Sequence, residues 1–256
     1  MDLDDPRPEI GDAFGAALVA HHEARDTGHA WAADRDAGWY VVERDDGYTD
    51  PLPAAPYFAE PDDWQWDLER AALEACTGRV LDVGTGAGRF CLALAERGLD
   101  AVGLDPSPGA IDVSRSRGVP TLHLGTVFDL DEPGPFDTFL LMGNNVGLLE
   151  SVDHAPRFLG ELRRLAAPEA RVLGIGLDPS ATDDPRHLAY QAFNRSRGRL
   201  PGQLRLRIRF QHLATGWWDY LLVPPTELVD LVGGSGWDVV DLDHEGPLYL
   251  ATLALA

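Results

Sequence analysis

Lysine is absent from this 256-residue sequence, so all 21 of its basic residues are arginines. Aspartate and glutamate together number 42, and the formal net charge is −21. Because affinity for a phosphate backbone comes from cationic side chains, this balance argues against a nucleic-acid partner. The missing lysine is typical of codon usage in a GC-rich genome. Adaptation to high salt, where dense acidic surfaces stay hydrated, is the alternative interpretation.

Cysteine is also scarce, and Cys76 and Cys91 are the two that occur. They exclude a cysteine metal cluster, and they favour a reducing compartment over a disulfide scaffold. No apolar run approaches the roughly 20 residues that cross a bilayer. Asp2, Asp4 and Asp5 stand where a secretory signal would carry positive charge. We therefore expect a cytoplasmic protein with neither a membrane partner nor a bound metal.

From residue 78 onward, short apolar runs alternate with amphipathic segments. The expected strands cover residues 79–83, 100–105, 121–125, 136–143, 170–177, 237–243 and 248–255. The expected helices cover residues 88–97, 107–117, 153–165 and 225–233. Such alternation predicts a doubly wound α/β sheet with helices on both faces. The last two strands follow each other closely and predict a closing antiparallel pair.

Two segments, 1–75 and 179–223, depart from this alternation. The first is expected to hold a helix at 11–25, an Asp-Gly hairpin turn at 45–47, an irregular proline-rich linker at 51–56 and a helix at 62–76. The second is expected to hold a helix at 185–195 and a hairpin of strands at 204–210 and 217–223. The sequence therefore predicts an N-terminal cap (1–75) and a core (76–256) with a lid insertion (179–223).

A glycine-rich turn joins the first core strand to its helix. Its glycines stand at 84, 86 and 88, whereas a dinucleotide-binding turn of the form G-x-G-x-x-G needs a small residue at position 89, which is Arg89. Asp82 precedes the turn and would repel a pyrophosphate, but it can orient the cationic amino-acid end of S-adenosylmethionine. The pattern favours that sulfonium cofactor over a dinucleotide.

A second acidic residue, Asp105, ends the next expected strand, where a carboxylate can accept both hydroxyls of a ribose. The alternative is purely structural: Gly84 and Gly86 make a tight turn, and Asp105 caps the helix that begins at Ser107. The combination of the turn, the acid and the alternation favours the cofactor interpretation.

Asp82, Gly84, Gly86, Gly88 and Asp105 together resemble the motifs of the class I S-adenosylmethionine-dependent methyltransferases. The resemblance covers residues 78–178 and the ending at 225–256. It implies a Rossmann-like sheet of seven strands with a final antiparallel strand, and S-adenosylmethionine as the cofactor, released as S-adenosylhomocysteine. Further cofactor contacts implied are those of Pro106, Thr126, Val127, Gly143 and Asn144. One departure is that the family often has an acid after the third strand, where this chain has Thr126.

The acceptor side of the site is less defined. Asn144 and Asn145 are candidates for polar contacts near the methyl group, although Asn also suits a strand-to-helix turn. His187 shares one helix face with Tyr190 and Asn194 and is the candidate general base. Other histidines make weaker candidates: His123 is interpreted as structural, and the pair at 21–22 lacks further metal ligands.

Aromatic residues and arginines also concentrate in the two lid segments. The tryptophans there are Trp31, Trp39, Trp64, Trp66, Trp217 and Trp218, of which we expect most to pack the lid and one or two to touch a ligand. Six arginines lie between 195 and 209. Those at 205, 207 and 209 share one strand face, which predicts a solvated or salt-bridged surface. Docking of an anionic acceptor or a carrier domain is the alternative.

Taken together, these features predict a methyltransferase acting on an oxygen or nitrogen of a small molecule, in specialised metabolism, as a monomer or homodimer. The alternatives are an enzyme that uses S-adenosylmethionine for cyclisation or decarboxylation, a non-catalytic ligand-binding partner, and a dehydrogenase.

Overall fold

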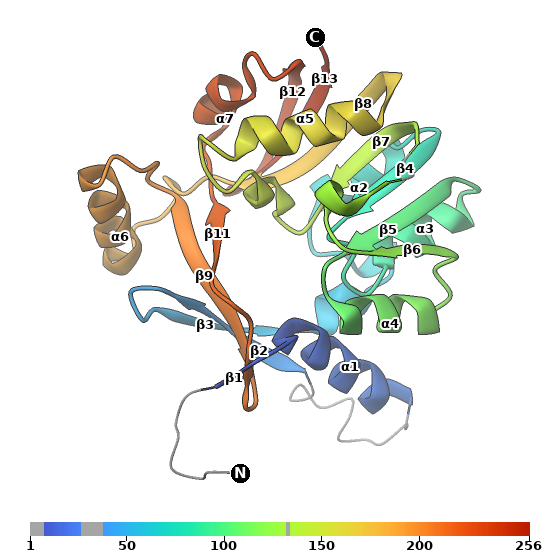
Figure 1. Cartoon of the computed structure of the whole chain (residues 1–256), viewed down its shortest axis with the longest axis horizontal. Helices are drawn as coiled ribbons and strands as arrows, with labels where there is room; N and C mark the ends of the chain where they lie inside the picture. The colour runs from blue at the N-terminus through green and yellow to red at the C-terminus, as the bar shows by residue number, and fades with distance from the viewer. Residues whose placement is uncertain (1–7, 27–37, 132–133) are drawn as a thin grey trace.

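The computed structural model describes residues 8–26, 38–131 and 134–256 and contains two β-sheets (Figure 1). The larger sheet has seven strands in the order β12-β13-β8-β7-β4-β5-β6. In chain order they are β4 (Arg79–Val83), β5 (Asp100–Asp105), β6 (Thr121–Leu124), β7 (Phe136–Leu141), β8 (Ala166–Leu177), β12 (Trp237–Glu245) and β13 (Leu248–Leu255). Strands β4 to β8 are parallel, whereas β13 runs antiparallel to β8 and β12. This confirms the Rossmann-like sheet with a reversed last strand.

Helices cover both faces of this sheet. They are α2 (Asp67–Ala75), α3 (Arg89–Glu96), α4 (Pro108–Ser116), α5 (Ala155–Leu165) and α7 (Pro225–Val232). Because side chains alternate along a strand, Phe139 of β7 joins the core under α5 and α7, while its neighbour Leu140 joins the core under α2 and α3. No helix within the described ranges is both long and apolar enough to cross a membrane.

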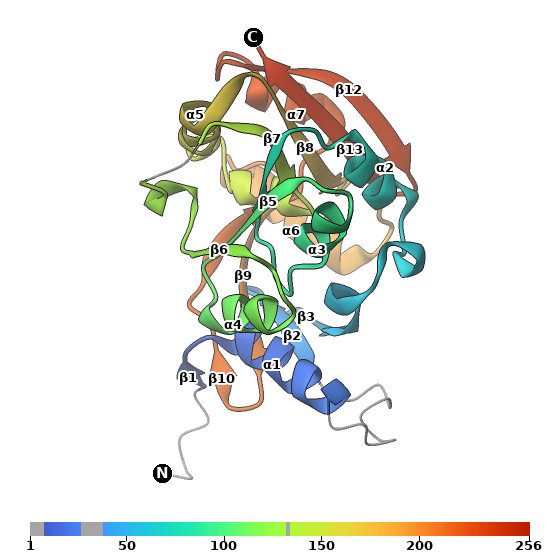
Figure 2. The same cartoon turned by 90° about the vertical axis from the view of Figure 1, so that its right-hand side faces the viewer.

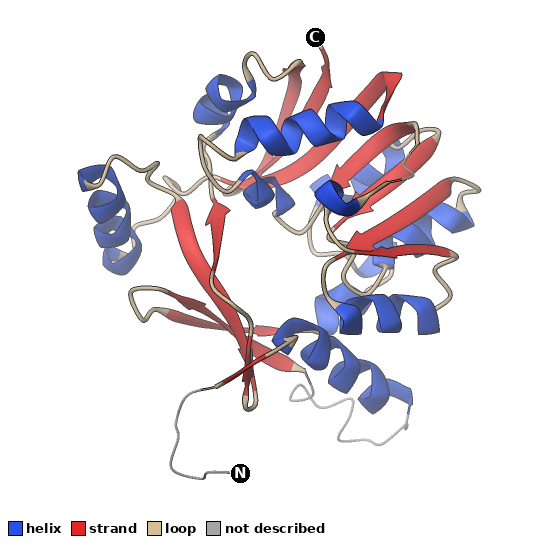
Figure 3. Ribbon diagram, in the orientation of Figure 1, coloured by secondary structure: helices blue, strands red, loops and turns tan. Residues whose placement is uncertain are grey.

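The second sheet combines the N-terminal segment with the insertion (Figure 3). Its strands are β1 (Glu9–Ile10), β2 (Trp39–Arg44), β3 (Thr49–Pro53), β9 (Gln203–Phe210), β10 (Leu213–Ala214) and β11 (Trp218–Leu221). β9 pairs with β2 on one side and with β10 and β11 of its own segment. The two parts of the chain outside the core alternation therefore form one sheet, with α6 (Pro185–Ser196) beside it.

Helix α1 (Ala13–Asp26) ties this second unit to the core by packing against α4 (Figure 2). A Cβ at Gly109 would lie 2.7 Å from the backbone of Gly15, so the two helices approach closely at a pair of glycines. Asp12 precedes α1, and its carboxylate accepts hydrogen bonds from the Gly15 amide, the Gly109 amide and the Ser107 hydroxyl at 2.8–2.9 Å. One carboxylate thus joins the start of α1 to the start of α4.

Two expectations for the N-terminal segment are wrong in detail. Pro51 and Pro53 belong to β3 rather than to an irregular linker. Both are tolerated because β3 is an edge strand, where a missing N–H costs no ladder bond. The expected helix at 62–76 begins only at Asp67, because Trp64 takes an extended backbone and buries its ring against Phe90.

Candidate active site

The turn between β4 and α3 is built on glycines with left-handed backbone. The φ angle is +78° at Gly84, +57° at Gly86 and +77° at Gly88, a region in which any residue with a Cβ is strained. The amides of Gly84 and Thr85 donate to the Leu104 carbonyl at 2.7 and 3.0 Å. The turn is therefore fixed to the carboxyl end of β5, at the edge where open α/β sheets bind ligands.

Asp82 lies beneath this turn and is 2% exposed. Its Oδ2 accepts a hydrogen bond from the Thr85 hydroxyl at 2.7 Å, and the Cys91 thiol lies 3.6 Å from the same oxygen. Burial raises the pKa of Asp82 to about 6, against the lowering effect of these donors. In this structure the carboxylate braces the glycine turn from below.

Asp105 stands at the end of β5 and is 4% exposed. Its Oδ1 accepts from the Ser107 amide and its Oδ2 from the Gly86 amide, both at 2.9 Å. Each carboxylate oxygen has a second lone pair, so the group can still accept two hydroxyls. Burial raises the pKa of Asp105 to about 7. The cap of α4 is the Ser107 side chain, which accepts from the Ala110 amide, and the adjacent Pro106 is exposed.

The turn after β6 is held by its own side chains. Thr126 accepts a hydrogen bond from the Phe128 amide at 3.3 Å, and its amide and hydroxyl donate to Asp129 at 2.8 and 2.7 Å. These donors lower the pKa of Asp129. Val127 is 1% exposed and belongs to the core. The acid that follows the third strand therefore stabilises the turn.

The two asparagines after β7 have different environments. The Asn145 amide nitrogen donates to the Val83 carbonyl at 2.9 Å and is therefore committed to the glycine turn. Asn144 has a left-handed backbone with φ +71°, and its Oδ1 is buried with no hydrogen-bond partner among the described residues. A Cβ at Gly143 would meet nothing within 4 Å, so open space adjoins this turn.

A cluster of aromatic side chains covers the glycine turn, and the sequence analysis did not single it out. The Tyr57 ring lies 3.0 Å from the position that a Cβ of Gly86 would take. The hydroxyls of Tyr57 and Tyr40 are 3.3 Å apart, and Phe14 of α1 packs edge-on against both rings. Burial raises the pKa of both tyrosines. The cluster connects the cap to the cofactor edge of the core.

Tyr220 of β11 closes the same space from the insertion. Its hydroxyl donates to the Asn144 carbonyl at 2.6 Å, and a Cβ at Gly147 would lie 2.2 Å from its ring. Burial raises the pKa of Tyr220 as well. The sequence carried one usable signal for Tyr40, which shares its strand face with Val42 and Arg44, and none for Tyr220.

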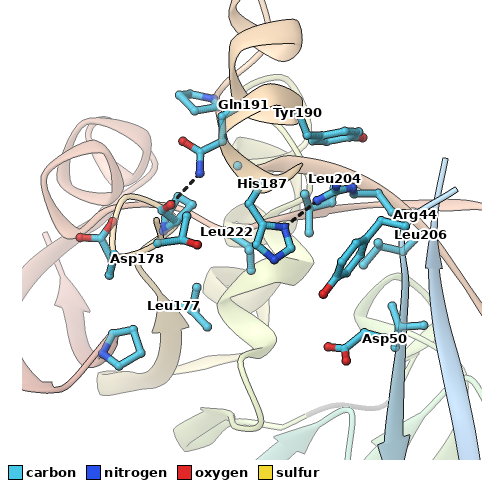
Figure 4. Close-up of a pocket in the computed structure, with 18 residues that line it drawn as sticks. Arg44, Asp50, Leu177, Asp178, His187, Tyr190, Gln191, Leu204, Leu206 and Leu222 are labelled. Carbon is cyan, nitrogen blue, oxygen red and sulfur yellow. Dashed lines mark hydrogen bonds between the residues drawn. The ribbon is translucent and has the colours of Figure 1, made fainter. Parts of the chain in front are cut away.

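A cavity of about 380 Å³ lies between α6, the second sheet and the end of β8 (Figure 4). Its walls are mainly aliphatic and come from one face of β2, β3 and β9. The lining residues on that face are Val42, Arg44, Tyr48, Asp50, Leu204 and Leu206. Leu177 and Asp178 contribute from the end of β8, and His187 from α6. The insertion, which includes α6, and the N-terminal hairpin therefore line one space together.

His187 faces this cavity with one nitrogen already engaged. Arg44 Nη1 lies 3.1 Å from His187 Nδ1. Arginine can only donate, so Nδ1 must accept and a neutral imidazole carries its proton on Nε2. Arg44 is itself held by two hydrogen bonds to Asp46, both at 2.8 Å, and by the rings of Tyr48 and Tyr190. The structure thus fixes the orientation of His187 through a buried arginine.

The remaining side chains on the predicted helix face serve packing. Tyr190 is 3% exposed and donates to Asp45 at 2.6 Å, and Asn194 is fully buried and donates to the carbonyls of Pro201 and Gln203. Both therefore hold α6 against its surroundings.

The arginines of β9 lie on the opposite face of the second sheet from the cavity. Arg207 and Arg209 form ion pairs with Glu43, and Arg205 forms one with Asp219. Arg199, which precedes β9, also pairs with Asp219. Hydrogen bonds from Arg207 lower the pKa of Glu43. The salt-bridged surface is therefore the interpretation that these contacts favour.

The tryptophans of the lid segments differ in burial, since Trp39 and Trp217 are exposed. Trp31 lies outside the described residues, and none of the other five lines the cavity. Trp64 is buried and donates to the Ala59 carbonyl, while Arg207 stacks on Trp217.

The other histidines that the sequence offered as candidates, which are at positions 21, 22 and 123, lie outside the cavity. His21 and His22 lie against Phe58, and His22 Nε2 is 2.8 Å from the Ser116 hydroxyl. His123 lies in β6. Over the described ranges, no group of three or more potential metal-ligating side chains is brought together.

Comparisons of sequence agree with this site. Residues 59–242 match the profile of the methyltransferase-domain family. An uncharacterised methyltransferase of Mycobacterium tuberculosis is 50% identical over 44 residues, which are 17% of this chain and 18% of that protein. The chain therefore matches less than a fifth of that relative's length.

Comparisons of structure extend over more of the chain. A SAM-dependent methyltransferase from Bacteroides fragilis, solved with S-adenosylhomocysteine, is 25% identical with a TM-score of 0.79 over 96% of this chain and 95% of that one. The methyltransferase CcbJ from Streptomyces caelestis shares the fold at 18% identity, with a TM-score of 0.55 over 78% and 98% of the two chains. With the glycine turn, Asp105 and the reversed last strand, these matches show that the chain belongs to the S-adenosylmethionine-dependent methyltransferases.

Proposed function

We propose that this methyltransferase acts on an oxygen or nitrogen of a small molecule, in specialised metabolism. The observation that carries the proposal is the mainly aliphatic cavity of about 380 Å³, partly open to solvent, at the end of β8. β8 is the neighbour of β7 in the sheet, so the cavity lies one strand away from the Asn144 turn. A cavity of this size suits a small ligand, and the net charge of −21 disfavours a nucleic-acid acceptor.

The fit of the cofactor rests on three features of the core edge. Asp105 has lone pairs left to accept the two ribose hydroxyls, with Pro106 beside them. The turn at Thr126 and Val127 is held by hydrogen bonds to Asp129 and adjoins the expected adenine position. Open space at Gly143 and the unpartnered Oδ1 of Asn144 suit the polar methionine end.

The glycine turn completes this part of the proposed site. Gly84, Gly86 and Gly88 let the backbone bend at the cofactor edge, and Asp82 supports that bend from below. Within the proposal these residues shape the site and leave contacts with the ribose to Asp105.

S-adenosylmethionine supplies an electrophilic methyl group on a sulfonium centre. Transfer by direct displacement depends on alignment of the acceptor and on exclusion of water. Tyr40, Tyr57 and Tyr220 serve this purpose because they enclose the space without adding charge, their pKa values being raised by burial. Asn145 acts through the glycine turn that it holds.

His187 is the side chain of α6 that we place against the acceptor. Because Arg44 occupies Nδ1, the atom available to a ligand is Nε2, which carries a proton in the neutral ring. We therefore assign His187 a role in orienting an acceptor through donation from Nε2, in preference to the general-base role that the sequence suggested.

The test is a transfer assay with radiolabelled S-adenosylmethionine and separated low-mass, protein and nucleic-acid fractions of cells that carry the gene. We expect label in the low-mass fraction, and loss of that label in D105A. Label in protein or nucleic acid would overturn the small-molecule proposal. Cofactor binding without transfer to any fraction would favour non-methyl chemistry instead.

A further inference from the structure

Asp50 lies between the two ends of the proposed acceptor space. On β2, Tyr40, Val42 and Arg44 point to the same face because side chains alternate along a strand. Asp50 of β3 is the cross-strand partner of Val42. Tyr40 and Arg44 each lie two residues from Val42, so Asp50 is offset from each of them by about 7 Å along the strand direction.

These two levels belong to different parts of the site. Tyr40 contacts Tyr57, which covers the glycine turn at Gly86. Arg44 holds His187 at the other end of the cavity. Along the strand direction Asp50 consequently lies at a level between Tyr40 and Arg44, and it lines the cavity itself.

Asp50 is exposed at the mouth of the cavity, so its carboxylate is solvated and accessible to a ligand. Within the described part of the chain its carboxylate forms no hydrogen bond or ion pair, and in Figure 4 it faces the same space as the His187 ring. Its charge also adds to the effects of burial, Tyr57 and Tyr220 that raise the pKa of Tyr40, as expected of a nearby anion.

Among the described residues that line the cavity, none supplies a free cation to balance Asp50. Arg44 is paired with Asp46, and a neutral His187 adds no charge. Asp178, the second carboxylate of the wall, accepts hydrogen bonds from the Ser180 amide and hydroxyl at 2.8 and 2.6 Å. The cavity is therefore an aliphatic space with an excess of negative charge, which disfavours a carboxylate or phosphate ligand.

We propose that the acceptor is an aliphatic amine whose nitrogen is held by Asp50 and whose hydrocarbon part occupies the cavity. This inference rests on the proposed function and narrows it to nitrogen. The cationic form of the amine is attracted by Asp50 on entry, and the aliphatic wall favours its apolar part.

Methyl transfer needs only the amine and S-adenosylmethionine as reactants. The amine first releases a proton to solvent, and its nitrogen lone pair then forms a bond to the methyl carbon. The carbon–sulfur bond breaks, and its electron pair returns to sulfur, which leaves S-adenosylhomocysteine. The product is an N-methylammonium ion. Asp50 can accept hydrogen bonds from nitrogen before and after transfer, so it orients the acceptor throughout.

Binding of simple probes tests this inference without knowledge of the natural acceptor. Octylamine, octanol and octanoate are titrated by NMR into ¹⁵N-labelled protein saturated with S-adenosylhomocysteine. We expect octylamine to bind more tightly than the other two, with chemical-shift changes at β2, β3 and α6. In D50N the affinity for octylamine should fall about tenfold, which corresponds to about 1.4 kcal/mol, while that for octanol stays unchanged.

D238N is the matched control, because Asp238 is exposed at the start of β12 and its loss changes the net charge equally. If D238N weakens octylamine binding as much as D50N, attraction is only a general effect of an acidic protein. Tighter binding of octanoate, an unchanged D50N variant, or no binding of octylamine would each overturn the inference. Failure of S-adenosylhomocysteine to bind would instead count against the proposed function.

Discussion

The side-chain amide of Asn145 donates a hydrogen bond to the main-chain carbonyl of Val83 at 2.9 Å, and so joins the end of β7 to the end of β4. A Cβ at Gly84 would lie 2.4 Å from the same amide nitrogen, which shows how closely the two turns approach. The neighbouring Asn144 keeps its own Oδ1 free toward the open space. One asparagine therefore builds the site, and the other is available to a ligand.

Asn145 is the first position to test. N145D replaces an amide donor by a carboxylate that faces carbonyl oxygens, whereas N145A only removes the donor. Loss of a partner from a part-buried carbonyl costs about 1–3 kcal/mol, and we expect N145D to be the less stable variant. Chemical denaturation of both variants measures this difference. Equal stability of N145D and wild type would show that the Val83 bond is dispensable.

Asp105 predicts the pH dependence of cofactor binding. Its pKa is raised from 3.8 to about 7, and hydroxyl donors favour the ionised form. Affinity for S-adenosylhomocysteine should therefore rise by up to about tenfold as pH increases from 6 to 8, as measured by calorimetry. D105N should bind weakly at every pH. A dependence centred near pH 6 that survives in D105N would belong to Asp82, whose pKa is about 6.

The raised pKa of Asp105 has the opposite effect on the stability of the protein without cofactor, which falls as pH rises. A carboxyl whose pKa is higher when folded binds more protons in the native state, so its contribution to stability is lost as pH rises through about 7. D105N should remove this part of the pH dependence. Thermal unfolding of wild type and D105N between pH 4 and 8 provides the measurement. A wild-type advantage that grows with pH would contradict the assignment.

Gly147 predicts a steric effect on Tyr220. In G147A the new Cβ would lie 2.2 Å from the tyrosine ring, so the ring must move and its bond to the Asn144 carbonyl is lost. Overpacking of this kind costs about 1–3 kcal/mol. Y220F removes the hydrogen bond but keeps the ring, and we expect a smaller loss of stability. If G147A matched wild type in both stability and cofactor affinity, Tyr220 would have no part in shaping the site.

The tautomer of His187 can be observed directly. Donation from Arg44 to Nδ1 predicts that neutral His187 carries its proton on Nε2. Long-range ¹H–¹⁵N spectra distinguish the two tautomers, and H187Q identifies the signal. R44M should mix the tautomers, whereas R205M, on the far face of the sheet, should not. A proton on Nδ1 in wild type would refute the role assigned to Arg44.

The hydrogen bonds of Asp12 are expected to stabilise the attachment of the N-terminal cap to the core. D12A removes the acceptor for Gly15, Gly109 and Ser107 and should destabilise the protein by about 1–2 kcal/mol, the usual cost of a lost helix cap. D12N keeps one acceptor oxygen and should lose less. Hydrogen exchange should report faster opening of α1 than of α5 in D12A. Uniform exchange across both helices would indicate global unfolding in place of local detachment.

Much of the core could be predicted from the sequence alone. The apolar runs from β4 to β8 and the glycine turn are local patterns, because a buried parallel strand and a left-handed turn each restrict the residues that can form them. Asp82 and Asp105 were identifiable for the same reason, since strand ends in such a sheet meet at one edge.

The part of the site that we propose for the acceptor could not be predicted from the sequence in this way. β9 pairs with β2 across more than 150 residues of sequence, and no local pattern specifies which distant strand completes a sheet. That pairing decides that Arg44 and Asp50 line the cavity beside α6, that Arg44 reaches His187, and that the β9 arginines meet Glu43. The sequence by itself determined the cofactor fold, because its signals lie within single turns. Only the tertiary structure decided the cavity that we propose for the acceptor, because long-range strand pairing and burial bring its walls together.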